Sequence, residues 1–472
     1  MSIFYRPENS VAADFIPFYW KGEYHLFYLR DWRDSANHGE GTPWWHLVTK
    51  DFVHFDDWGE ALPRGTKAEQ DLFVFTGCVF ESGGLFHIFY TGHNPHFRAA
   101  GRPAQAVLHA TSPDLRTWTK DREFSFFAPA DQGYEPHDWR DPFVYWDERR
   151  CEFAMLLAAR KTTGPSRNRG CVALATSPDL QAWSVRAPFW APDEYFTHEC
   201  PDLFRIGKWW YLVYSTFTER SVTHYRLSRS LAGPWRAPAN DTFDGRAYYA
   251  AKTAGSEKRR FVFGWLPTRN EEKDDSWWQW GGDLVTHELI QQSDGTLTVR
   301  SPKAVLAQFT KRQPVQPTPV LGAWKTGARQ FVADATGRNS LLSLGALPDE
   351  CLVELDVVIE KGTVAAGILF RADATFDKYY QLRFEPANQR MVMDRWPRPG
   401  DQPFMLERPL AIKASQAIRL RVLVSGTCLV AYANDTIALS CRMYEHRVGR
   451  LGVFVTEGQA QFSRVSVRTQ SE

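Results

Sequence analysis

A strand-like signature returns five times along the first two thirds of the chain, and this repetition limits the fold more than any other feature. Each copy is a short run of aromatic and aliphatic residues. The copies are Gly22–Tyr28, Gly84–Tyr90, Cys151–Leu157, Gly207–Tyr214 and Arg259–Trp265. Short strands that recur in this way, separated by Gly, Pro and Asp, are typical of β-propeller blades. The sequence therefore predicts five blades.

A second repeated element supports this interpretation. Three segments share a Thr, an Asp and a closing aromatic residue, and a fourth segment is a looser copy. They are Thr49–Phe55, Thr111–Trp118, Thr176–Trp183 and Ser228–Trp235. The Asp of the first three copies recurs with a period in the mid-sixties, at positions 51, 114 and 179. A propeller blade has this length in sequence.

Three acidic residues occupy comparable places in these repeats. Counting back 14 to 16 residues from the end of each signature reaches Asp14, Thr76, Asp141, Glu199 and Tyr249 in turn. The first strand of each blade lines the central channel of a propeller, so such positions are expected to surround one mouth. A lone Asp more often serves a turn. Three acids at equivalent positions instead predict a functional cluster. Like charges oppose each other's ionisation, so such a cluster is costly unless it serves a function.

The last third of the chain has a different sequence pattern. At 472 residues the chain is too long for one ordinary domain. The Pro-rich segment Gln313–Pro319 breaks the repeat as a linker does. Beyond it, Leu352–Val357 and Ile418–Val422 alternate with period two, and Asn434-Asp435 predicts a hairpin turn. We therefore expect an all-β chain: a five-bladed β-propeller over residues 1–310 and a C-terminal β-sandwich over residues 320–472.

Charge and composition exclude several classes of partner. The formal net charge is only +1 and no block of like charge occurs, so neither nucleic acid nor a membrane is an expected partner. Met1–Pro7 lacks the pattern of a secretion signal, which favours a cytoplasmic protein. The seven Cys are scattered singly without metal-ligand spacing, which predicts reduced thiols, no metal and no cofactor.

Three carboxylates at one mouth suit the cleavage of a glycosidic bond. Retaining cleavage needs one carboxylate as nucleophile and one carboxylic acid that first gives and then takes a proton. A third carboxylate can hold sugar hydroxyls and offset positive charge on the ring. Glu199 suits the acid/base role, because its apolar neighbours and nearby like charges favour a protonated carboxyl. Arg140 is expected to keep its neighbour Asp141 ionised, and can also bind a hydroxyl.

These residues together resemble glycoside hydrolase family 32, the β-fructofuranosidases. The segments that carry the resemblance are Asp14 ahead of Lys21–Tyr28, Trp44–Phe55, Phe75–Gly77, Arg140–Pro142, Glu199–Asp202 and Gly281–Leu289. The resemblance runs nearly end to end and implies a five-bladed propeller with an appended sandwich. It implies Asp14 as nucleophile, Glu199 as acid/base and Asp141 as transition-state stabiliser, without a cofactor.

Several other side chains are candidates for contacts with the substrate. They are Arg140, Trp45, His46, Phe75, Thr76 and Trp280. An aromatic residue beside a strand, such as Trp45, belongs to the core more often than to a sugar platform. Trp280 lies in a Gly-flanked loop, which favours a place on the rim.

The first motif departs from the family pattern. The family surrounds its nucleophile with an Asn-Asp-Pro-Asn-Gly run, whereas this chain has Ala13, Phe15 and Ile16 around Asp14. Leu29 stands where a Gln usually follows. Losing amides that bind sugar hydroxyls is expected to change which furanoside fits. The charged residues just past the first signature are as suited to replacement contacts as to a solvated loop: Arg30, Asp31, Arg33 and Asp34.

The sequence thus predicts an exo-acting retaining glycosidase that releases a terminal fructofuranosyl or related furanosyl unit from short oligosaccharides. A transferase is an alternative, because a sugar hydroxyl can replace water in the second step. A non-catalytic sugar-binding propeller is another, which the presence of all three acids disfavours. The sandwich either buttresses the propeller or forms the contact of a homo-oligomer.

Overall fold

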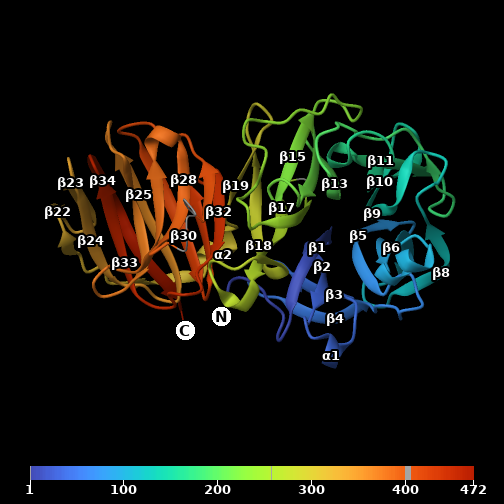
Figure 1. Cartoon of the computed structure of the whole chain (residues 1–472), viewed down its shortest axis with the longest axis horizontal. Helices are drawn as coiled ribbons and strands as arrows, with labels where there is room; N and C mark the ends of the chain where they lie inside the picture. Colours follow the sequence, from blue (N-terminus) through green and yellow to red (C-terminus); the bar gives the residue numbers. More distant parts are fainter. Residues whose placement is uncertain (1, 257, 399–404, 472) are drawn as a thin grey trace.

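The computed structural model describes residues 2–256, 258–398 and 405–471, and strands dominate it. Figure 1 shows the sheets of the first 300 residues arranged around a ring, with the orange and red strands of the last third packed at one side of it. The predicted all-β fold of propeller and sandwich is confirmed.

Five antiparallel blades form the ring. The first blade contains β1 (Val11–Trp20), β2 (Glu23–Asp31), β3 (Trp44–Thr49) and β4 (Asp56–Leu62). The second contains β5 (Phe73–Ser82), β6 (Leu85–His93), β7 (Gln105–Ser112) and β8 (Thr119–Phe126). The third contains β9 (Tyr134–Asp147), β10 (Glu152–Lys161), β11 (Gly170–Ser177) and β12 (Ser184–Val185). The fourth contains β13 (Glu199–Ile206), β14 (Trp209–Thr216) and β15 (Val222–Ser228). The fifth contains β16 (Tyr249–Gly255), β17 (Arg260–Arg269), β18 (Trp278–Gln291) and β19 (Leu297–Arg300).

The recurring signature forms the second strand of every blade. These strands are β2, β6, β10, β14 and β17, each with neighbours on both sides. Their central aliphatic side chains have no exposed surface, namely Leu26, Ile88, Leu156, Leu212 and Val262. A strand covered on both faces must be apolar along its length. This requirement explains why the signature recurs.

The second repeat forms the turn between the third and fourth strands. In the second blade, Asp114 Oδ1 accepts the backbone N–H groups of Arg116 and Thr117, both at 2.8 Å. Asp179 makes the same pair of bonds in the third blade, each at 2.9 Å. An Asp that bonds the backbone two residues on is a common turn device. These Asp residues therefore serve structure.

A β-bulge interrupts the first strand of every blade. In β1, Ala13 pairs with Leu29 and Ile16 with Phe27, so two residues, Asp14 and Phe15, oppose one. Equivalent register shifts occur in the other four first strands, at Thr76, Asp141-Pro142, Cys200-Pro201 and Ala250-Ala251. A bulge bends its strand and re-aims a side chain, and bulges are frequent beside active sites.

The bulges correct one expectation about register. Asp14 and Asp141 are the first bulged residues of their strands, with φ of 40° and 58°. In the fourth blade that place belongs to Cys200, with φ of 52°, and Glu199 stands one residue earlier. Glu199 is therefore equivalent to Arg140, the residue before Asp141. The distance from these positions to the end of the signature varies from 14 to 16 residues, so the sequence does not reveal that Glu199 is displaced by one position.

Hydrogen bonding between the first and last blades closes the ring. Ala12 of β1 pairs with Gly282 of β18, which joins the two blades in one sheet. The backbone N–H of Leu284 also donates to the carbonyl of Tyr5 at 2.8 Å. The amino-terminal strand thus belongs to both ends of the ring.

Two large sheets form the sandwich. One has the order β22 (Trp324–Thr326), β23 (Gln330–Asp334), β34 (Gln459–Gln470), β25 (Glu350–Ile359), β30 (Ala417–Ser425), β31 (Cys428–Ala433) and β32 (Ile437–Arg442), with β20 (Phe309–Gln313) also on β34. The other has the order β21 (Thr318–Leu321), β24 (Asn339–Ala346), β33 (Arg450–Thr456), β26 (Ala365–Ala372), β27 (Tyr379–Glu385), β28 (Arg390–Trp396) and β29 (Leu406–Pro409).

Helices are short, and the Pro-rich segment is not a bare linker. The helical turns are α1 (Ser35–His38), α2 (Lys303–Ala307), η1 (Pro95–Ala100), η2 (Ser166–Asn168), η3 (Asn270–Glu272) and η4 (Pro386–Asn388). On either side of the Pro-rich run, β20 joins one sandwich sheet and β21 the other. The sandwich sheets therefore begin at Phe309, because this segment supplies an edge strand to each.

Buried polar groups tie the two domains together. Asp244, just before the fifth blade, accepts the backbone N–H and the hydroxyl of Ser440 at 2.8 and 2.6 Å and lies 3.0 Å from His287 Nε2. His287 Nδ1 lies 2.8 Å from the Tyr432 hydroxyl. Arg408 of the sandwich donates to the Asp244 carbonyl at 2.7 Å. The interface is thus specified by directional bonds.

Candidate active site

A pocket of about 350 Å³ opens among the first strands of the blades. Its walls include Asp14, Asp141, Glu199, Arg140, Tyr249 and Trp280. The structure therefore brings together the three acids from the first, third and fourth blades. Asp14 and Asp141 are bulged residues whose strands turn them toward this space, and Glu199 reaches it from the position just before its bulge.

Asp14 is held by donors from two different blades. Its Oδ2 accepts the Thr76 hydroxyl at 2.7 Å, and its Oδ1 accepts the Trp265 indole N–H at 3.0 Å. Burial and the charges of Asp141 and Glu199 raise the pKa of Asp14 to about 7, although the hydrogen bonds from Thr76 and Trp265 oppose the rise. Both oxygens are fixed in orientation, as a nucleophile requires.

Asp141 is buried beside a guanidinium. Its Oδ2 accepts the Cys200 backbone N–H at 2.9 Å, and Arg140 Nε lies 3.8 Å away. Burial raises the pKa of Asp141 to about 6, and Arg140 lowers it without cancelling that effect. Arg140 therefore acts on Asp141 in the expected direction, favouring the ionised carboxyl, while burial opposes it. At pH 7 the carboxyl is still mostly ionised.

Glu199 is more accessible than Asp141, with 19% of its side chain exposed against 4%. Its Oε1 accepts Arg140 Nη2 at 3.1 Å, and its Oε2 accepts the Tyr249 hydroxyl. Arg140, Glu199 and Tyr249 occupy equivalent places in neighbouring blades, each just before the bulge of its strand. This explains why their side chains meet. A proton donor for the leaving group needs such access to the pocket.

The predicted contact residues fall into two groups. Phe75, Arg140 and Trp280 line the pocket, and Trp280 is 36% exposed at its rim. Thr76 has no exposed surface and acts on the site through its bond to Asp14. The second group lies outside the pocket and consists of Trp45 and His46.

Trp45 and His46 are blade-packing residues, which corrects their prediction as substrate contacts. The Trp45 indole donates to Asp57 at 2.7 Å and Arg30 stacks on its ring at 4.4 Å. His46 is buried, stacks on Phe27 at 3.9 Å and pairs with His25 at 3.1 Å. Both lie on β3, two strands away from the channel. Position along the chain could not show this.

The loop after the first signature borders the pocket. An adjoining pocket of about 480 Å³ is lined by Asp31, Arg33 and Asp34 and shares the walls Phe75 and Trp280. Arg33 Nη1 donates to Thr268 and Gln279 of the fifth blade, both at 2.7 Å. Arg33 Nη2 donates to the Trp280 carbonyl at 2.5 Å. This loop therefore contacts the rim of the pocket through Arg33, although Arg33 and residues 35–39 are exposed.

Two important residues had no predicted role. Trp265 donates to Asp14, and Tyr249 donates to Glu199. Tyr249 lies in the counted register of the acids, and Trp265 ends the fifth signature. A signal for both was present, but a hydrogen bond between blades cannot be read from one chain position.

The described part of the chain has neither a candidate metal-binding cluster nor a helix suited to a membrane. Within residues 2–256, 258–398 and 405–471, no group of three or more His, Cys, Asp or Glu is placed to hold a metal ion. Over the same part of the chain, no helix has the length and apolar character needed to cross a membrane.

Comparison with known proteins identifies the family. The model of the glycosyl hydrolases family 32 N-terminal domain matches residues 12–299. The chain belongs to this family. A raffinose invertase of Escherichia coli is 24% identical over 94% of this chain and 89% of its own length. A levanbiose-producing levanase of Bacillus subtilis is 25% identical over 62% of this chain, and the chain spans only 59% of that enzyme.

Solved structures share the whole fold. Fructan 1-exohydrolase IIa of Cichorium intybus superposes with a TM-score of 0.75 at 16% identity, over 99% of this chain and 97% of that one. The sucrose-6-phosphate hydrolase of Lactobacillus gasseri gives 0.74 at 16% identity, over 100% and 93%. Family membership makes the chain a glycosidase of the fructofuranosidase type.

Proposed function

We propose that this enzyme is an exo-acting, retaining hydrolase that releases a terminal fructofuranosyl or related furanosyl unit from short oligosaccharides. The single observation that carries the proposal is that Asp14, Asp141 and Glu199 share one small pocket, each with its own fixed hydrogen-bond partners. The pocket, of about 350 Å³, has room for one or two sugar units, which suits the end of a sugar chain better than its middle.

In the first step, an Asp14 oxygen attacks the anomeric carbon while Glu199 gives its proton to the departing glycosidic oxygen. The carbon–oxygen bond to the leaving sugar breaks, and a furanosyl ester on Asp14 forms. Asp141 holds ring hydroxyls and offsets the positive charge of the transition state. Arg140 and Tyr249 keep the Glu199 carboxyl aimed at the leaving oxygen.

In the second step, Glu199 takes a proton from water, and the water oxygen attacks the same carbon. The ester bond breaks, and Asp14 returns as a carboxylate. Thr76 and Trp265 stabilise that departing carboxylate, because both donate to its oxygens. Two displacements at one carbon restore the starting configuration.

The altered first motif supports an unusual preference among furanosides. Ala13, Phe15, Ile16 and Leu29 are apolar and buried, so their side chains offer a sugar no hydrogen bond. A site with fewer donors discriminates less against sugars that lack a hydroxyl. We propose that the enzyme accepts furanosides besides fructosides, with the leaving sugar directed toward the pocket beside Asp31 and Arg33.

A panel of fructosides and arabinofuranosides, tested with wild type, Asp14→Asn and Glu199→Gln, examines these roles. We expect both variants to lose about 10³-fold or more in kcat/KM on every substrate that the wild type cleaves. Exposed Asp131→Asn and Glu148→Gln serve as matched controls and should retain full rates. Ordinary rates in both active-site variants would contradict the assignment. NMR of the first product should show retained configuration.

A further inference from the structure

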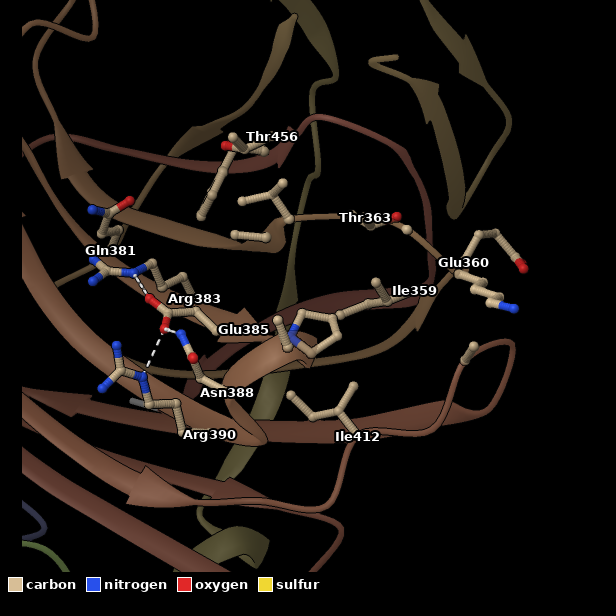
Figure 2. A pocket seen from close by; sticks show the side chains of 18 of the residues that line it. Ile359, Glu360, Thr363, Gln381, Arg383, Glu385, Asn388, Arg390, Ile412 and Thr456 are labelled. Carbon is tan, nitrogen blue, oxygen red and sulfur yellow. Dashed lines mark hydrogen bonds and ion pairs between the residues drawn. The ribbon is translucent and has the colours of Figure 1, made fainter. Parts of the chain in front are cut away.

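A second pocket lies in the sandwich, far in sequence from the propeller mouth and sharing no lining residue with it. It has a volume of about 770 Å³, within the range of ligand sites. Gln381, Arg383 and Glu385 of β27 line it on one side, and Thr456 of β33 on another (Figure 2). Alternate residues of β27 face the core, so these three share the opposite face.

The centre of the pocket is a rigid group of charged and amide side chains. Glu385 Oε1 accepts Arg383 Nε at 2.6 Å, and its Oε2 accepts Arg390 Nε at 2.6 Å and the Asn388 amide at 2.8 Å, as the dashed lines in Figure 2 mark. Burial opposes ionisation, yet these three bonds hold the pKa of Glu385 at about 2. The group is therefore already ordered before a ligand arrives.

Other polar groups on the walls have unmet hydrogen-bonding capacity. Among the residues that the structure describes, the Gln381 amide, the Thr456 hydroxyl and Arg383 Nη2 have no protein partner. The amide and the hydroxyl can each donate and accept, and the guanidinium adds a donor. Such groups at a pocket wall bind water or a ligand.

The charges of the pocket are matched in pairs. Arg383 Nη1 and Arg398 Nε bond the Asp394 carboxylate at 2.7 and 2.9 Å, and Arg390 Nη1 bonds Glu407 at 2.7 Å. An anion would meet the ionised Glu385, and a cation would meet the guanidinium groups. A hydroxyl group suits this wall best, because it both donates and accepts and carries no charge.

The remaining walls are apolar and could contact the C–H faces of a sugar. Ile359, Ile412 and Phe454 line the pocket together with the short side chain of Ala365 on β26. Phe454 belongs to a small apolar cluster that also includes Ala365. Apolar walls with a few oriented polar groups are the usual make-up of a small-molecule site.

We propose that this pocket is a second carbohydrate site, which binds a short neutral sugar chain and performs no catalysis. Gln381, Thr456 and Arg383 would bind ligand hydroxyls, and Glu385 would accept one. The proposal does not rest on hydrolysis in the propeller. It gives the sandwich a task of its own, which is to hold a substrate-like sugar on the enzyme.

Binding stoichiometry tests this proposal in the full-length chain carrying Asp14→Asn, which prevents turnover. Calorimetric titration with sucrose and with a short fructo-oligosaccharide should give two equivalents for at least one of these sugars. Adding Gln381→Ala and Thr456→Val should reduce this to one. Gln330→Ala, an exposed site on the other sandwich sheet, is the matched control and should leave two.

Two further measurements keep the test decisive. In the otherwise wild-type chain, the Gln381→Ala/Thr456→Val pair should melt within a degree or two of wild type and cleave a small substrate at an unchanged rate. Glu385→Gln should also weaken the second site about tenfold or more. One equivalent in the Asp14→Asn chain, or two in the double variant, overturns the proposal. Displacement by inorganic sulfate would overturn the ligand class.

Discussion

Asp141 in the propeller mouth and Asp244 at the domain interface are equally buried, with 3% and 2% exposure, yet their pKa values move in opposite directions. Burial raises the pKa of Asp141 to about 6. Burial also acts on Asp244, but the bonds from His287 and Ser440 and the charge of Arg408 hold its pKa below the usual range. At equal burial, the hydrogen-bond and charge partners of a carboxylate therefore decide whether its pKa rises or falls.

The difference separates a working site from a structural one. At the interface both oxygens of Asp244 have close hydrogen-bond partners in Ser440 and His287. At the mouth, Asp141 has one backbone donor and feels the charge of Glu199. Groups gathered against their mutual repulsion are typical of catalytic sites. The fold tolerates that cost in the mouth because the interface and blade cores are well paired.

Between the two aspartates compared above, the larger effect on activity is expected from Asp141→Asn. Removing this charge should lower kcat/KM by about 10² to 10³-fold, because an electrostatic stabiliser of the transition state is lost. Initial rates on the best furanoside measure this. A loss of less than about fivefold would place Asp141 outside the chemistry.

The same variant should be more stable than wild type at pH 7.5. The folded pKa of about 6 lies above the ordinary 3.8, so the folded chain loses stability as pH rises through that window. Asn carries no charge and can still accept the Cys200 N–H. We expect a gain of up to about 3 kcal/mol in the free energy of unfolding at pH 7.5 and none at pH 3.5. Denaturant titration at both pH values tests the sign.

Asp244→Asn should make the protein less stable than wild type at pH 7. Breaking this buried network should cost about 2 to 4 kcal/mol of unfolding free energy at pH 7. Because the folded pKa is lowered, the carboxylate's contribution is present above about pH 4 and declines as pH falls. Activity per folded molecule should stay within twofold. Asp131→Asn, exposed on the propeller, is the control for the substitution itself.

Tyr249→Phe removes one bond to Glu199 and keeps the ring. We expect kcat to fall about tenfold with KM little changed, because the bond matters most while the proton moves. Steady-state kinetics separate the two constants. Tyr19→Phe, at a partly exposed site in β1, controls for the loss of a hydroxyl. An equal fall in the control, or a change in KM alone, would remove Tyr249 from this role.

Trp265→Phe should produce the smallest effect, a displacement of the pH profile. The acid limb of kcat/KM for wild type should lie near pH 7, where Asp14 loses its proton and becomes a nucleophile. Loss of the indole donor removes an interaction that lowers this pKa, so the limb should move to higher pH. Trp277→Phe, at a 70% exposed position, should leave it unchanged. A move to lower pH would contradict the assignment.

The sequence predicted what repetition encodes. Five signatures predicted the central strands of five blades, since apolar runs covered on both faces follow directly from burial. It also predicted that three acids would meet, because rotation about an axis brings equivalent places together. The position of Glu199 one residue ahead of its bulge was missed, because a bulge depends on strand pairing.

Contacts between blades were beyond the sequence. Trp45 and Trp280 are both aromatic residues beside strands, yet only Trp280 reaches the pocket, because Trp45 lies two strands from the channel. The bond from Trp265 to Asp14 joins residues 251 positions apart. The local sequence around these residues shows neither the distance of Trp45 from the channel nor the bond between Trp265 and Asp14.

The pairing of Ala12 with Gly282 also has a consequence for biosynthesis. Asp14 lies two residues from that seam, and its partner Trp265 comes from the last blade to leave the ribosome. In a growing polypeptide, the proposed nucleophile Asp14 therefore lacks its Trp265 donor until the ring closes. Catalysis can begin only when the final blade is in place, so prematurely terminated products would contain all three acids and remain inert.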